Sequence, residues 1–145
     1  MRRALRPLFG LAAALATATT ALAQDAPCEN AQTDAVPAFE AAKSAMLQGD
    51  YETFYKLSTP HVPDAESRKP QLIGPLQSAL PGGFKSCWTV VERFEEPGLY
   101  QDVTFFDSGA GPVGLYLLGA VYKGEITIMH FAYSQVPSDM LDNLK

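Results

Sequence analysis

The second half of the chain consists of four strand-like runs joined by short links. Each run is rich in β-branched or aromatic residues, and each link carries glycine or proline turn chemistry. The links exclude a parallel sheet, because parallel strands need crossover connections of about a dozen residues or more. The pattern predicts a four-stranded antiparallel meander with a tight hairpin at Lys123 and Gly124. The predicted strands are Ser86 to Phe94, Leu99 to Asp107, Val113 to Tyr122 and Glu125 to Val136.

The residues before these strands have the spacing of helices. Thr33 or Asp34 can cap a first helix, and Pro37 is tolerated in its first turn. Apolar residues then recur at the helical period, which predicts that one face of this helix is buried. The predicted buried stripe is Val36, Phe39, Ala42 and Met46.

The stretch from Gln48 to Pro60 places three aromatic rings and two acids within thirteen residues, which suits either an active-site wall or a helix corner. Gly49 is expected to end the first helix, because glycine enters the left-handed region without a steric penalty. Asp50 is expected to cap a second, shorter helix. Aromatic residues at this spacing are what a short helix needs to pack on a sheet, so the corner is favoured over an active site. The predicted apolar side is Tyr51, Phe54, Tyr55 and Leu57.

The segment between the helices and the strands is less regular. His61 to Pro70 is polar and is predicted to be a surface loop. Apolar residues follow, but Gly74 and Pro75 stand where a continuous helix would lose a hydrogen bond. One or two broken helical turns are therefore expected before the first strand.

Helices followed by an antiparallel sheet predict an α+β domain, with N-terminal helices packed on a curved four-stranded sheet. The stretch from Ala38 to Pro60, an Ala-rich helix followed by Gly49-Asp50-Tyr51 and a short second helix, resembles the start of nuclear transport factor 2-like domains, also called SnoaL-like or cystatin-like. The resemblance covers roughly residues 34–136. It implies a cone in which the sheet wraps around the long helix and leaves a pocket at the open end. The superfamily includes isomerases, dehydratases and epoxide hydrolases as well as binding and assembly domains, so the fold by itself does not give a function.

The first 23 residues have the features of a signal peptide. Three arginines precede an apolar run from Leu8 to about Leu15, and Ala21-Leu22-Ala23 forms a small-residue cleavage site before Gln24. The run is shorter and richer in alanine than a membrane span, which needs about 20 strongly apolar residues. The expected organisation is a signal peptide at 1–23, an N-terminal arm at 24–33 and one domain at 34–145. The alternative is an uncleaved anchor, but export to the periplasm or the outside is favoured.

Beyond this leader the chain is acidic. Eight basic residues stand against 16 acidic ones, a formal net charge of −8. Nucleic acid is therefore not expected as a partner, because its binding depends on Lys and Arg replacing counterions. Adhesion to anionic lipid and stable membrane insertion after cleavage are not expected either.

Two cysteines, Cys28 and Cys87, follow the cleavage site. In an oxidising compartment they predict a disulfide that ties the arm to the first strand. Closing a loop of this length stabilises a fold by about 4 kcal/mol in the chain-entropy model. A redox or metal-binding pair is the alternative, but there is no C-x-x-C, and neither His61 nor His130 is close in sequence to a cysteine.

Two residues are candidates for acid–base chemistry. Asp102 alternates with Tyr100, Thr104 and Phe106, so its carboxylate is predicted to share their face and could line a pocket. The favoured alternatives are a position on the solvent face or a pairing across strands with a lysine or arginine. His130 is expected in register with Ile126, Ile128 and Ala132, inside the cone, where an imidazole could act as a base or simply be hydrogen-bonded. The candidate pocket residues are Phe39, Met46, Trp88, Tyr116, Ile128 and His130.

Other chemistries lack their sequence signals. The glycines of "DSGAGPVG" precede a strand and not a helix, and no Gly-x-Ser-x-Gly occurs, so no phosphate loop or hydrolase elbow is predicted. No metal and no cofactor is expected. Three functions remain: an exported domain that binds a small apolar ligand or a protein partner, a cofactor-free lyase or isomerase using His130 or Asp102, and a structural module that forms a homodimer through its open sheet face. The first is favoured.

Overall fold

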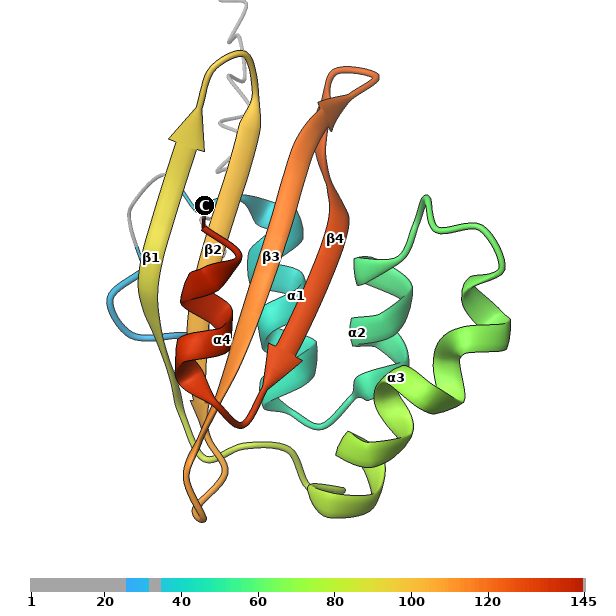
Figure 1. The fold of residues 1–145 in the computed structure, drawn as a ribbon, viewed down its shortest axis with the longest axis vertical. Coiled ribbons are helices and arrows are strands. Elements are labelled where there is room, and N and C mark those ends of the chain that lie inside the picture. The colour runs from blue at the N-terminus through green and yellow to red at the C-terminus, as the bar shows by residue number, and fades with distance from the viewer. Residues whose placement is uncertain (1–25, 32–34, 145) are drawn as a thin grey trace, which may run out of the picture.

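The computed structural model describes residues 26–31 and 35–144 (Figure 1). The predicted signal peptide and the predicted helix caps Thr33 and Asp34 lie outside these residues. Within the described ranges, no helix combines the length and the apolar character needed to cross a membrane.

The sheet is an antiparallel meander. Its strands are β1 (Cys87–Glu95), β2 (Leu99–Asp107), β3 (Pro112–Tyr122) and β4 (Glu125–Ser134), and they lie in the order β1-β2-β3-β4 (Figure 1). The turn residues Lys123 and Gly124 have φ values of 52° and 86°, and a two-residue type I′ hairpin requires positive φ at both positions. The predicted α+β class and the meander are confirmed.

Helices α1 (Pro37–Leu47) and α2 (Tyr51–Ser58) meet at the predicted corner. Gly49 has a φ of 76°, and a Cβ added to it would lie 2.6 Å from the backbone nitrogen of Gly83, so both conformation and space require glycine. The Asp50 carboxylate accepts a hydrogen bond from the backbone N–H of Thr53 at 3.1 Å, which caps α2. The helix-corner interpretation is confirmed, because the rings of this corner are buried in the core: Tyr51, Phe54 and Tyr55.

Helix α3 (Ala65–Ala79) replaces the predicted loop and broken turns, so that prediction was wrong. The helix includes Pro70 and Pro75, since each proline removes only its own N–H donor and tertiary contacts hold the segment. Ile73 and Leu76 are buried in the core. The hydroxyl of Tyr133 on β4 also donates to the Leu72 carbonyl at 2.5 Å.

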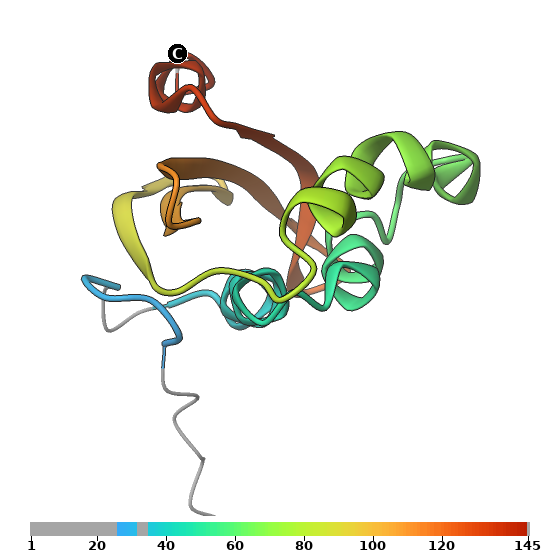
Figure 2. The ribbon, with the colours of Figure 1, turned by 90° about the horizontal axis from the view of Figure 1, so that it is seen from below.

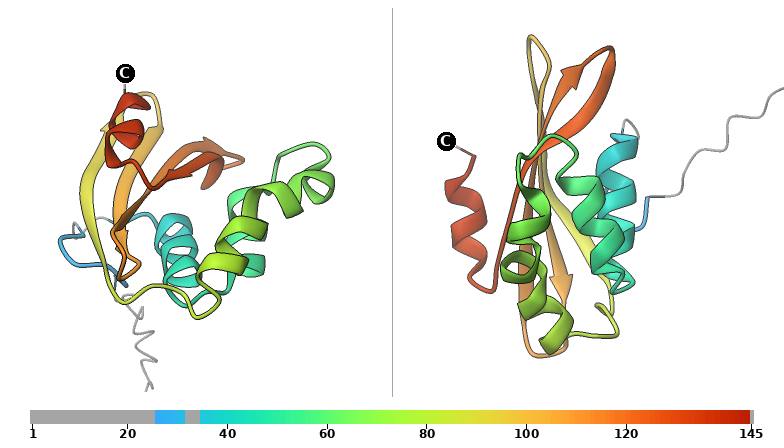
Figure 3. Two further views of the ribbon diagram at one scale, coloured as in Figure 1. Left: turned by 60° about the horizontal axis from the view of Figure 1, so that its bottom comes forward. Right: turned by 90° about the vertical axis from the view of Figure 1, so that its right-hand side faces the viewer.

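A last helix, α4 (Pro137–Asp142), was not predicted. It lies on the opposite face of the sheet from α1, with α2 and α3 on the α1 side (Figures 2 and 3). The larger core lies between the sheet and α1 to α3. A smaller one lies under α4, around Val103, Tyr116 and Met140.

Two irregularities in the ladders change which face a side chain occupies. The β1–β2 register shifts between Thr89 and Val91, and the β3–β4 register shifts opposite Leu118 and Gly119, where Met129 is the extra residue of β4. Side chains alternate between faces along a strand, so each extra residue reverses the alternation beyond it.

The N-terminal arm is attached to the edge of the sheet. Cys28 and Cys87 form a disulfide, with their Cα atoms 4.7 Å apart. Glu29 then bridges β1: its N–H donates to the Cys87 carbonyl at 3.0 Å, and its carbonyl accepts from the Thr89 N–H at 2.9 Å. The predicted disulfide and the tether to the first strand are confirmed.

Candidate functional site

Two charged residues lie on the buried face of α1. Lys43 follows Phe39 by four positions and precedes Met46 by three, so it belongs to the same helical face as the apolar stripe. Its exposed fraction is 0 %, and that of Glu40, one turn earlier, is 4 %. Fully buried lysines and glutamates are rare unless they are paired, so their partners are decisive.

The sheet supplies two acids directly beneath α1. Glu92 on β1 and Asp102 on β2 are register partners on neighbouring strands. The extra residue in β1, Val90, reverses the alternation after Thr89 and so places Glu92 on the helix-facing side. Like charges opposite each other destabilise a sheet, so this pair needs a cation between the layers.

Lys43 is that cation. Its Nζ lies 2.5 Å from Glu40 Oε1, 2.9 Å from Asp102 Oδ2 and 4.0 Å from Glu92 Oε1. The other oxygen of Asp102 accepts a hydrogen bond from the Thr104 hydroxyl at 2.7 Å. Both oxygens of Asp102 are therefore engaged, one by a charge and one by a hydroxyl.

Burial and pairing act in opposite directions on this lysine. Burial favours the neutral amine, but the charge of Asp102 and the hydrogen bonds to Glu40 and Asp102 outweigh it and raise the pKa of Lys43 above its ordinary value. The side chain is therefore a permanent ammonium ion at neutral pH. Burial raises the pKa of Glu40, although the hydrogen bond and charge of Lys43 oppose the shift.

The geometry of the three acids could also suit a metal ion. Single oxygens of Glu40, Glu92 and Asp102 lie within 4.8 Å of one another. The Lys43 ammonium occupies the space among them, as its distances show. In the described part of the chain, the Lys43 ammonium therefore stands where a metal ion would bind.

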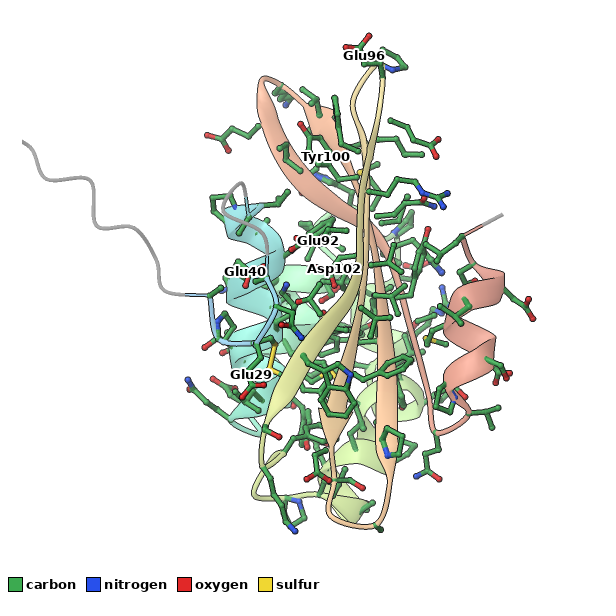
Figure 4. All side chains as sticks on the ribbon, turned by 90° about the vertical axis from the view of Figure 1, so that its left-hand side faces the viewer. Glu29, Glu40, Glu92, Glu96, Tyr100 and Asp102 are labelled. Carbon is green, nitrogen blue, oxygen red and sulfur yellow. A yellow bond between two sulfur atoms is a disulfide. The ribbon has the colours of Figure 1, made fainter. Side chains whose placement is uncertain are left out.

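An open pocket of about 370 Å³ adjoins the cluster at the N-terminal end of α1. Figure 4 shows Glu92 and Asp102 side by side on the sheet, Glu40 facing them from α1, and Tyr100 farther toward the β1–β2 turn. Glu92 and Asp102 line this pocket, Glu40 does not, and apolar and aromatic side chains form much of the remainder. Those side chains are Val36, Pro37, Phe39, Phe94, Tyr100 and Ile126.

Of the candidate catalytic and pocket residues named from the sequence, Asp102 and Phe39 line this pocket. Asp102 faces the helices, and its basic partner is Lys43 of α1 and not a residue across the strands. Met46 and Ile128 are buried in the main core. Neither lines the pocket at α1.

The remaining aromatic candidates lie on the other side of the sheet. Trp88 packs edge to face against Phe105, with ring centroids 6.0 Å apart. Tyr116 is buried under α4, where its hydroxyl accepts a hydrogen bond from Gln101 Nε2 at 3.0 Å. The sheet thus separates these two rings from the pocket at α1.

The expected register of His130 was wrong. Because Met129 is an extra residue in β4, His130 pairs with Leu118 while Ile128 pairs with Gly119. The imidazole is exposed and lies 6.3 Å from the Tyr116 ring, on the face opposite to Ile128. It lines a different open pocket, of about 430 Å³, with Arg68, Leu72 and Tyr133.

Three residues of the cluster were missed: Glu40, Lys43 and Glu92. A signal for Lys43 was present, since an apolar stripe that includes Phe39 and Met46 passes through position 43. Glu92 carried no such signal, because its face depends on the bulge at Val90.

Comparison with protein-family models, with curated proteins and with solved structures finds no match for this chain.

Proposed function

We propose that this chain is an exported binding domain that holds a small ligand in the pocket beside α1. The observation that carries the proposal is an open pocket of about 370 Å³ whose lining includes Asp102, an acid that is already paired with Lys43. Ligand sites in proteins are typically concave, mainly apolar and furnished with a few fixed polar groups. The sequence resemblance to nuclear transport factor 2-like domains agrees with a pocket between the long helix and the sheet.

Binding is favoured over catalysis by the state of the buried groups. Asp102 is a poor candidate for a general base, because Lys43 and Thr104 already engage both of its oxygens. Lys43 is a poor nucleophile, because its raised pKa keeps it protonated. These residues are suited to orienting a ligand through fixed charge.

A cofactor-free lyase or isomerase is the second candidate. Glu92 favours it, since its carboxylate lines the pocket with a side-chain exposure of 17 % and could reach a bound substrate. His130, proposed from the sequence for this role, lies at the other pocket. A homodimer through the open sheet face receives less support, because α4 packs on that face.

Export is proposed from the signal-like leader together with the Cys28–Cys87 disulfide, which is typical of oxidising compartments. N-terminal sequencing of the exported protein should find Gln24 first. A mature chain that still contains Arg2 to Ala23 would contradict this proposal.

A ligand screen tests the binding proposal. The purified protein is screened by thermal shift against cationic, neutral and anionic small molecules, and hits are measured by calorimetry. Tyr100→Ala should weaken every hit, whereas Tyr122→Ala, a matched change at an exposed ring outside the pocket, should not. The same compounds are then followed for turnover in wild type, Glu92→Gln and Asp102→Asn. Turnover that disappears in either variant would replace the binding proposal with the enzymatic one.

A further inference from the structure

The pocket beside α1 combines two side-chain pairs on one face of the β1–β2 hairpin. Glu92 is the register partner of Asp102, and Phe94 is the register partner of Tyr100 two positions farther along. The two rings lie close together, with centroids 4.7 Å apart and planes inclined by 40°. An acidic pair is thus followed directly by an aromatic pair, and all four residues line the pocket.

The charge at this end of the pocket is negative. Three carboxylates, those of Glu40, Glu92 and Asp102, surround the single ammonium of Lys43. Arg93 also lines the pocket, and its positive charge is offset by Glu95, whose Oε1 lies 3.4 Å from the guanidinium. Two of these carboxylates, Glu92 and Asp102, line the pocket, and the acidic chain as a whole adds a field that attracts cations.

One of the three acids, Glu40, is not fully satisfied by hydrogen bonds from the described residues. Glu40 is only 4 % exposed, and among the described residues its Oε2 has no hydrogen-bond donor. The Lys43 ammonium contacts the other oxygen, Oε1, at 2.5 Å. A buried acceptor that lacks a donor is costly, and a positive ligand nearby would reduce that cost.

The aromatic pair selects the kind of cation. A metal ion would need the space that Lys43 Nζ occupies, and the rings of Phe94 and Tyr100 offer it no ligand. An alkylammonium group, by contrast, is attracted to the faces of aromatic rings and gains from burying its carbon atoms. The apolar contacts of Phe39 and Ile126 would receive the rest of such a molecule.

We infer that the ligand of this pocket is a small organic cation, an amine or quaternary ammonium compound with an apolar body. This inference rests on the proposed binding function and narrows it to one chemical class. The ammonium group lies over Phe94 and Tyr100 and faces Glu92. Glu92 is the most exposed of the three acids, with a side-chain exposure of 17 %. The apolar body extends along α1.

A matched pair of probes tests the charge. Choline and 3,3-dimethyl-1-butanol have the same shape and differ in the charge of the central atom, and benzoate provides an anion. The purified disulfide-bonded protein is titrated with each, and the ring signals of Phe94 and Tyr100 are followed by NMR. Choline should bind at least about tenfold more tightly than the neutral isostere, since a desolvated cation–π contact and a facing carboxylate both favour it.

Variants of the pocket residues distinguish the preference for a cation from binding in general. Glu92→Gln should remove most of the preference for choline, and Tyr100→Leu should weaken choline by about fivefold. Glu66→Gln is the control, because that side chain is 86 % exposed on α3. Circular dichroism confirms that each variant is folded. Three results would contradict a cationic ligand but not a binding pocket. They are equal affinity for choline and the neutral isostere, a preference for choline that survives in Glu92→Gln, and tighter binding of benzoate. Absence of binding by every class of compound in the wider screen would overturn the proposed function as well.

Discussion

Lys43 on α1 and Asp102 on β2 form a buried ion pair, 59 residues apart in sequence, with 2.9 Å between Nζ and Oδ2. Neither residue exceeds 1 % exposure. The pair connects the helical layer to the sheet at the end of the candidate pocket. Its geometry also determines how the cluster should respond to mutation.

Removing the lysine should destabilise the fold strongly. Lys43→Met keeps much of the volume but leaves the carboxylates of Asp102 and Glu40 buried without their cation, which costs about 3–5 kcal/mol. Urea unfolding gives the change in free energy, and Lys56→Met, at an exposed lysine of α2, is the control. Combining Lys43→Met with Asp102→Asn should cost less than the sum of the single changes. Loss of under about 1 kcal/mol in Lys43→Met would show that the pair is not buried as described.

Replacing Lys43 with the smaller alanine should create a metal site. In Lys43→Ala the oxygens of Glu40, Glu92 and Asp102, within 4.8 Å of one another, lose the ammonium that stands among them. Hard divalent cations prefer such oxygen ligands, so Mn²⁺ should raise the melting temperature of Lys43→Ala and leave wild type unchanged. Adding Glu92→Gln should remove the effect. An equal response of wild type would mean that Lys43 does not occupy the site.

Glu40 should make stability depend on pH. Its pKa in the folded chain is raised above 4.5 by burial, so the folded state holds this proton more tightly than the unfolded chain does. Its contribution to stability is therefore present below pH 4.5 and is lost as the pH rises through the raised pKa. The stability of wild type relative to Glu40→Gln, measured by urea unfolding at a series of pH values, should fall over that range and then level off. A difference that grows with pH would reverse the sign assigned to this group.

The disulfide should stabilise the fold through a long loop. Cys28 and Cys87 are 59 residues apart, and the chain-entropy model gives about 4 kcal/mol for a loop of this length. Reduction and Cys87→Ala should lower the melting temperature by similar amounts, and replacing Cys28 as well should add nothing. Thiol labelling of the native, unreduced protein would contradict the bond.

Two glycines should respond in opposite directions to alanine. At Gly49 the φ of 76° and the close backbone of Gly83 leave no place for a Cβ, so Gly49→Ala should destabilise by more than about 1 kcal/mol. At Gly74, inside α3, nothing lies within 4 Å of an added Cβ, and Gly74→Ala should stabilise by about 0.5–1 kcal/mol. Thermal unfolding of both variants tests the pair. A stabilising Gly49→Ala would rule out the corner geometry.

Local chemistry was sufficient for much of the fold. The hairpin at Lys123 and Gly124 and the corner at Gly49 and Asp50 could be predicted because each depends on a few neighbouring residues. The pairing of the cysteines followed from their number. The continuity of α3 could not be predicted in this way, since its two prolines argue against it locally and tertiary contacts at Ile73 and Leu72 hold it.

The candidate site was decided by the tertiary structure. The sequence indicated which face of the sheet Asp102 occupies. The alternation of residues along a strand does not predict where a bulge occurs, because the position of an extra residue is determined by packing on both faces of the sheet. The bulge at Val90 turns Glu92 toward α1, and the one at Met129 turns His130 away. Lys43 acquires its role only when α1 docks on the sheet, since burial of its ammonium is tolerable only beside Asp102 and Glu40, and these three residues meet nowhere but in the folded chain.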